Sequence, residues 1–93
     1  MNWLYSKLDE LKSNIETIES GLDVINKMRG VSFTWNSTNR KSYGVIAQEI
    51  EQLLPDIVDD VENRKTVNYN ALIGFLIEAV KELSQEVSKL KGE

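Results

Sequence analysis

The chain of 93 residues contains no cysteine and no histidine. Without cysteine it can form no disulfide, and it offers no thiolate as a nucleophile or metal ligand. Without histidine it lacks the side chain that most often serves as a general base near neutral pH and as a nitrogen ligand for metals. Any catalysis would depend on carboxylates, lysine, tyrosine or serine, and we expect no metal site and no other cofactor.

Long apolar runs and basic stretches are absent as well. No apolar run approaches the roughly 20 residues that cross a bilayer, and the opening MNWLYSKLDELK lacks the basic and then apolar order of a signal peptide. The formal net charge is −4 and the sequence pI is near 4.8, whereas nucleic-acid-binding proteins usually carry a basic stripe. We therefore expect neither a nucleic-acid partner nor a membrane partner.

The first quarter of the chain carries a heptad pattern. Leucine or isoleucine recurs there at intervals of four and three residues, at Leu4, Leu8, Leu11, Ile15, Ile18, Leu22 and Ile25. This spacing is typical of a coiled-coil seam. Because Ser20 can cap a new helix, with Asp23 three residues later, we predict a helix from about 3 to 19 and a short one from about 21 to 28. Gly30 is expected to end the second helix in the left-handed conformation.

The middle of the chain reads as short strands around one helix. We predict strands at 31–35 and 43–46, a helix over 47–54 that Pro55 ends, and a hairpin of two strands around Asn63-Arg64. Its aromatic residues are expected to be core residues that join the sheet to the helices: Phe33, Trp35, Tyr43 and Tyr69. An acidic cluster at Asp56, Asp59, Asp60 and Glu62 is better explained as a solvated strand edge than as a cation site, since the spacing matches no EF-hand loop.

A single long helix is predicted from about 70 to 91. The sequence thus indicates one α+β domain over 1–93, with a helical seam at 3–28, a β and helix insert at 31–69, and the C-terminal helix. Unpaired seam residues favour a parallel homo-oligomer in which the long helices form a coiled-coil bundle. The predicted interface consists of Leu4, Leu8, Leu11, Ile15, Leu72, Leu76, Val80, Leu83, Val87 and Leu90. The alternative is a monomer in which both seams pack on each other as an antiparallel hairpin.

Read together, FTW…YGVIAQEIEQLLPDIV…KTVNYNALIGFLIEAVKELSQEV forms a recognisable pattern over about residues 7–90. It resembles the C-terminal intramolecular chaperone domain of bacteriophage tailspikes, tail fibres and neck appendages. That domain is the endosialidase type, or peptidase S74 family, and it also occurs in myelin regulatory factors. The matching motif residues include Phe33, Trp35, Gly44, Ala47, Gln48, Glu49, Pro55 and Tyr69.

The resemblance implies a homotrimer whose long helices bundle together. Its partners would be two further copies of itself and the upstream fibre or tailspike domain of the same polypeptide. It would act in the host cytoplasm during virion assembly, and it would remain at the fibre tip if it is not released. A trimerisation module of a regulator of the myelin regulatory factor type is an alternative with the same architecture.

The family typically cuts itself free before a serine, in a pattern close to Ser-Asp-x-x-Leu-Lys-x-Asn-Ile, and the serine works with the lysine five residues later. Here Leu11-Lys12-Ser13-Asn14-Ile15 fits the end of that pattern, so Lys12 takes the lysine position. Lys7 stands where the nucleophilic serine belongs, and Ser6 is one residue out of register, about 100° around a helix. The resemblance therefore predicts a copy that does not cleave, while an active peptidase that uses Ser6 with Lys12 is the alternative.

Overall fold

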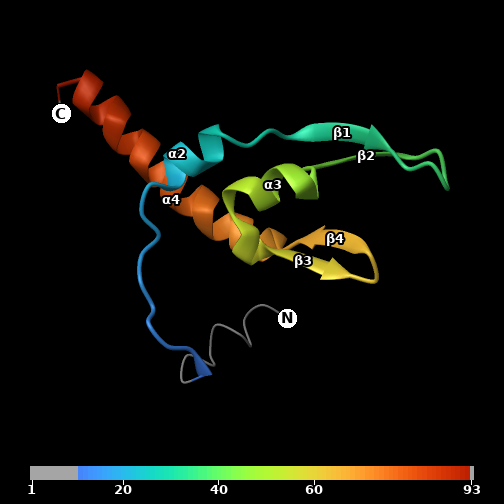
Figure 1. Cartoon of the computed structure of the whole chain (residues 1–93). Coiled ribbons are helices and arrows are strands. Elements are labelled where there is room, and N and C mark those ends of the chain that lie inside the picture. The colour runs from blue at the N-terminus through green and yellow to red at the C-terminus, as the bar shows by residue number, and fades with distance from the viewer. Residues whose placement is uncertain (1–10, 93) are drawn as a thin grey trace.

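The structure, a computed structural model, describes residues 11–92. Short helices and two antiparallel hairpins precede one long C-terminal helix (Figure 1). In chain order the elements are α2 (Gly21–Asn26), β1 (Val31–Thr34), β2 (Lys41–Gly44), α3 (Ala47–Leu53), the 3-10 helix η2 (Pro55–Ile57), β3 (Val58–Val61), β4 (Arg64–Val67) and α4 (Tyr69–Leu90). The predicted α+β class, the helix inserted between β segments and the long final helix are confirmed.

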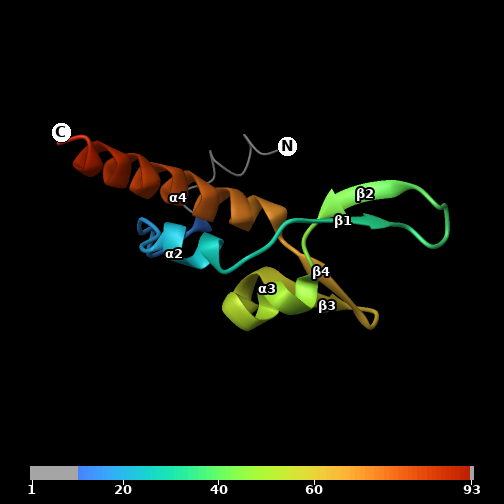
Figure 2. The same ribbon diagram turned by 90° about the horizontal axis from the view of Figure 1, so that it is seen from above.

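The first hairpin pairs β1 with β2, with Val31 opposite Gly44. Val31 and Phe33 alternate with polar residues, so one face of the hairpin is half-buried and the other faces solvent. The return strand begins at Lys41, two residues before the predicted start at Tyr43. The hairpin projects from the end of the molecule opposite the C-terminus (Figure 2).

The second hairpin pairs β3 with β4 through a turn at Glu62 and Asn63. Both residues have positive φ, 51° and 64°, which is the geometry of the type I′ turns that favour two-residue hairpins. The turn was predicted one residue later, at Asn63-Arg64.

A small aliphatic core lies between α3, η2 and the start of α4. Ile50 is 1% exposed and clusters with Ile57 and Leu72. Pro55 opens η2, where its fixed φ suits a first helical turn and its missing N–H is not needed. Leu72, which the sequence assigned to the subunit interface, is therefore a core residue of the single chain.

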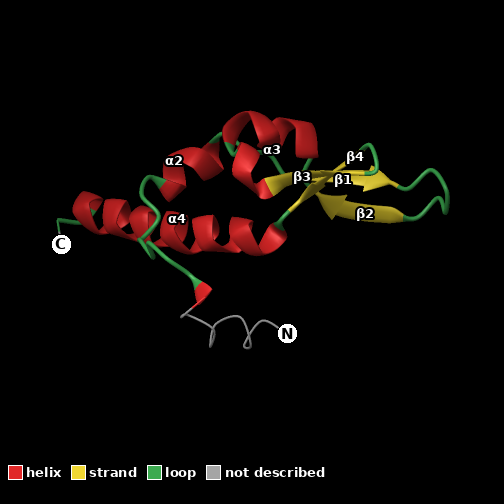
Figure 3. Cartoon of the chain, turned by 60° about the horizontal axis from the view of Figure 1, so that its bottom comes forward, coloured by secondary structure: helices red, strands yellow, loops and turns green. Residues whose placement is uncertain are grey.

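Helix α2 crosses α4 at very short range, and α2 and α3 lie on the same side of α4 (Figures 2 and 3). A Cβ at Gly21 would lie only 2.9 Å from the Phe75 carbonyl oxygen and 3.1 Å from the Ala79 amide nitrogen. The Glu82 carboxylate accepts hydrogen bonds from the amides of Gly21, at 2.7 Å, and Leu22, at 3.4 Å. A carboxylate from α4 thus satisfies the first free amides of α2.

Three details of the predicted ends of α2 are wrong. The Ser20 side chain makes no capping hydrogen bond, because its backbone is left-handed at φ 58° and Glu82 occupies the cap instead. The helix ends at Asn26, followed by Lys27 in a right-handed conformation. Gly30 does not have positive φ, so it is not a left-handed cap.

The predicted helix from 3 to 19 is wrong for residues 12–19, which form an irregular stretch; its earlier part lies outside the described residues. Leu11 and Ile15 are exposed, at 75% and 72%. A short amphipathic helix is stable only when its apolar side is packed. Because Leu11 and Ile15 remain mostly exposed, the apolar side of a helix over this stretch would lack the packing that it needs.

The prediction of aromatic core residues is also wrong. Trp35, Tyr43 and Tyr69 are exposed, and only Phe33 is half-buried. Phe33 meets Trp35 edge to face, with ring centroids 5.0 Å apart. The first hairpin, β1 and β2, lies beside the aliphatic core and does not cover it. Its aromatic rings therefore remain largely at the surface.

Candidate functional site

An exposed row of apolar side chains runs the length of α4. Its members recur at alternating intervals of four and three residues, and they are Tyr69, Ile73, Leu76, Val80, Leu83, Val87 and Leu90. Their exposed fractions range from 41% for Val87 to 89% for Leu90. An apolar surface of this extent and spacing is typical of a helix that packs on other helices. We call these seven residues the apolar row.

In heptad notation the row alternates a and d positions, with branched Ile73, Val80 and Val87 at a. Residues Leu72 and Ala79 fall at g, and both are buried against the chain's own elements. The packing of α2, α3 and η2 therefore occupies the g side of α4 and leaves the row exposed.

Five of the predicted interface residues lie in this row: Leu76, Val80, Leu83, Val87 and Leu90. The sequence reasoning missed Tyr69 and Ile73. The run ALIGFLIEAV is apolar nearly all round. Its pattern therefore does not distinguish the residues that pack inside the chain from those that stay exposed, and the folded structure is needed to separate them.

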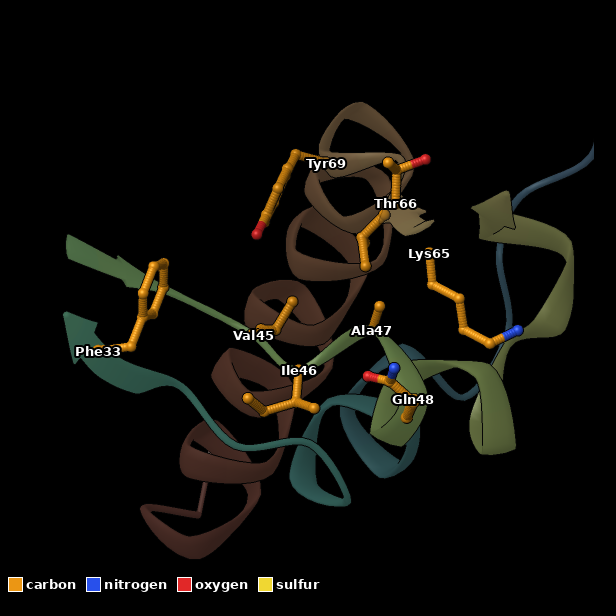
Figure 4. A pocket seen from close by; sticks show the side chains of 9 residues that line it. Phe33, Val45, Ile46, Ala47, Gln48, Lys65, Thr66 and Tyr69 are labelled. Atoms are coloured by element: carbon orange, nitrogen blue, oxygen red, sulfur yellow. The ribbon is translucent and has the colours of Figure 1, made fainter. Parts of the chain in front are cut away.

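Several motif residues surround one surface cavity of about 410 Å³. Its walls come from β1, β4, the connection between β2 and α3, and the start of α4, as Figure 4 shows. The lining includes Phe33, Ala47, Gln48, Lys65 and Tyr69. Motif residues that are distant in the sequence thus meet between the two hairpins.

Gly44 lies in close contact with Tyr69, which leaves no room for a side chain at position 44. A Cβ at Gly44 would lie 2.9 Å from the Tyr69 hydroxyl oxygen, closer than real Cβ contacts allow. The tyrosine at the start of α4 therefore rests directly on the end of β2.

Glu49, a further motif residue, forms an ion pair with Arg29. The Arg29 Nε lies 3.0 Å from Oε1 and the terminal Nη2 lies 2.8 Å from Oε2, so the contact is bidentate. The hydrogen bond from Arg29 lowers the pKa of Glu49, and the same contact raises the pKa of Arg29. The pair weakens as the pH falls through the lowered Glu49 pKa. The two residues are 20 positions apart, and no local pattern in the sequence pointed to Arg29.

The acidic cluster of the sequence contributes one residue to a second ion pair. Lys65 Nζ lies 3.1 Å from Glu51 and 3.5 Å from Asp60, and the hydrogen bond with Glu51 is the main cause of a raised Lys65 pKa. Within residues 11–92, no group of three or more carboxylates converges in a way that could hold a metal ion.

The segment of the predicted cleavage site is only partly described. Lys12 lies exposed in the irregular stretch that precedes α2. Lys7, Ser6, Leu4 and Leu8 lie outside the described residues, so the geometry of the serine and lysine positions stays a prediction. Over the described part of the chain, no helix is both long and apolar enough to cross a membrane.

The chain also matches a known protein family. The profile of peptidase S74, described as the chaperone of endosialidase, matches residues 9–59. The chain belongs to this family. The matched range contains most of the motif residues, and α4 follows it.

The chain is also similar to phage tail proteins. It is 34% identical over 93 residues to the long tail fiber protein Gp37 of Enterobacteria phage K3, with 89% of this chain and 8% of that protein covered. The Gp37 of Enterobacteria phage T2 is likewise 34% identical, with 7% of it covered. For Enterobacteria phage M1 the identity is 31% over 102 residues, with 97% of this chain and 41% of the relative covered. The chain therefore spans less than half the length of each of these relatives.

Proposed function

We propose that this chain is a trimerisation and intramolecular chaperone module that assists the folding of an upstream tail fibre. The observation that carries the proposal is the apolar row, seven exposed residues in heptad register on a 22-residue helix. Membership of the chaperone of endosialidase family supports it. The phage relatives favour a fibre over a eukaryotic regulator as the attached protein.

Association of the rows has a clear energetic reason. Each large aliphatic side chain stabilises by roughly 1.5–3 kcal/mol when it is buried instead of exposed. Branched residues at a with leucine at d suit two-stranded coiled coils. However, Ile77 adds an exposed apolar e position beside the row, which widens the contact face, and three copies are what the resemblance implies.

The benefit to a fibre is alignment. Three identical β-structured chains must pair in register, and a slip of one residue turns every side chain to the wrong face. Joining the chains at one end raises the effective concentration of the partner segments to about the millimolar range without any contact within the fibre. The module thereby favours correct registration before the fibre folds.

Light scattering tests the association. We expect a mass of three times 10.6 kDa at micromolar concentration, and a monomer for Leu83→Asp because a charge at a d position would be buried. Gln85→Asp, two residues further on the outward face, is the matched control and should leave the trimer intact. A monomeric unmodified chain would overturn the proposal.

We further infer that this copy does not cleave itself. The support is the lysine at position 7, since an amine cannot replace the hydroxyl that accepts the acyl group. The chain fused to its native upstream sequence should stay uncut on a denaturing gel. A cut beside Ser6 that Lys12→Ala abolishes would show that the peptidase alternative is correct.

A further inference from the structure

A narrow apolar groove lies between α2 and α4, beside the apolar row. Its volume is about 220 Å³, and its walls include Ile25, Met28, Gly30, Val45, Leu72 and Leu76. Leu76 belongs to both the groove and the row, so the two surfaces are continuous. An ideal Cβ at Gly30 would meet no atom within 4 Å, which leaves this part of the groove open.

Ile77 is an apolar residue that lies mostly at the surface of the described chain. Its side chain is 54% exposed, and it lies at heptad position e, directly after Leu76. The g side of the same helix packs on α2, α3 and η2, whereas the e side carries Ile77. The helix thus presents an apolar groove on one flank of its row and an apolar projection on the other.

The heptad register relates the two flanks. Leu72, in the wall of the groove, is at position g, and Ile77 is at position e of the next heptad. In a parallel coiled coil, the g position of one helix lies beside the e position of its neighbour. We propose that the groove between α2 and α4 receives Ile77 of a neighbouring copy, an inference that rests on the proposed parallel association.

This contact has two consequences for the assembly. The contact joins two different surfaces, the groove of one copy and Ile77 of the next. Three copies can therefore close into a ring in which every groove holds one Ile77. The contact also selects the parallel orientation, because antiparallel helices would place g beside g and leave each groove empty. Helix α2, which the Glu82 carboxylate and the Gly21 crossing hold against α4, becomes part of the subunit interface.

Cysteine cross-linking of the full chain tests the contact, since the natural sequence contains no cysteine. The double variant Gly30→Cys with Ile77→Cys should form disulfides between copies under mild oxidation, because the reaction requires Cβ atoms about 4 Å apart. A non-reducing gel should show covalently linked trimers. The matched control pairs Gly30→Cys with Lys81→Cys, an exposed position one turn further on the outer side of α4, and should remain largely unlinked.

The outcomes separate this inference from the proposed function. Trimers in light scattering that do not cross-link through positions 30 and 77 would overturn the groove contact while leaving association intact. Dimers in light scattering that do cross-link would support the groove contact and overturn the ring of three copies. A monomer would overturn both. Independently, Ile77→Ser should raise the concentration at which the trimer dissociates by about tenfold or more, whereas Lys81→Ser should leave it unchanged.

Discussion

Gly21 shows how a single residue sets the position of a whole helix. Its missing side chain lets the backbones of α2 and α4 touch, and Glu82 can then reach the free amides of α2. The neighbours that block a side chain here are the backbone atoms of Phe75 and Ala79, which cannot move aside without shifting α4. The sequence pattern had indicated only that a second helix begins near this glycine.

Two glycine substitutions should therefore have opposite effects. Gly21→Ala should destabilise the chain by about 1–3 kcal/mol, the usual cost of overpacking a tight contact. Gly74→Ala should stabilise it by about 0.5–1 kcal/mol, because the new Cβ meets only the end of the Ile18 side chain at 3.4 Å and alanine favours a helix interior. Urea unfolding of both variants measures the difference. Equal effects of the two substitutions would contradict the close crossing.

At the scale of elements, two helices, α2 and α4, begin where a specific side chain accepts their first amides. Helix α2 begins where Glu82 of α4 accepts its amides, whereas α4 begins with its own residue Asn68, whose Oδ1 accepts a hydrogen bond from the Ala71 amide at 3.2 Å. The first cap is tertiary and the second is local. Only the second can act before the chain has folded, so α4 is the element that the sequence by itself can start.

Removal of the local cap should weaken α4 measurably. Asn68→Ala is expected to lower the free energy of unfolding by about 0.5–2 kcal/mol. Asn70→Ala, an exposed position within the first turn, should change it by less than about 0.5 kcal/mol. Chemical denaturation followed by circular dichroism distinguishes the two. A loss at Asn70 as large as that at Asn68 would argue against capping.

The whole molecule has little core of its own. The buried apolar residues of the described chain are Ile50, Ile57, Leu72 and Ala79, whereas the apolar row and Ile77 face solvent. A chain of this length buries only about 60–65% of its unfolded surface even when compact. The folded state is therefore expected to gain much of its stability from association.

Thermal stability should accordingly depend on protein concentration. The Tm of the unmodified chain should rise when the protein concentration is increased about a hundredfold, because association stabilises the folded state by mass action. Leu83→Asp should abolish this dependence, and Gln85→Asp should keep it. A Tm that stays constant for the unmodified chain would mean that its folding and association are not coupled.

The sequence by itself determined the features that depend on local periodicity. Alternation predicted the hairpins, the single proline marked the end of α3, and heptad spacing indicated both the long α4 and most of its apolar row. These predictions succeeded because strand and helix periods are properties of neighbouring residues. The family resemblance rested on the same short motifs.

Only the tertiary structure decided which apolar residues the chain buries for itself. It placed Leu72 in the core and left Ile77 at the surface. It paired Arg29 with Glu49 and made Glu82 the residue that caps α2. It also left residues 12–19 without a helix, although their spacing is that of a seam. The physical reason is that a side chain at helical spacing is buried only where another element meets it, and such contacts join residues far apart in the chain.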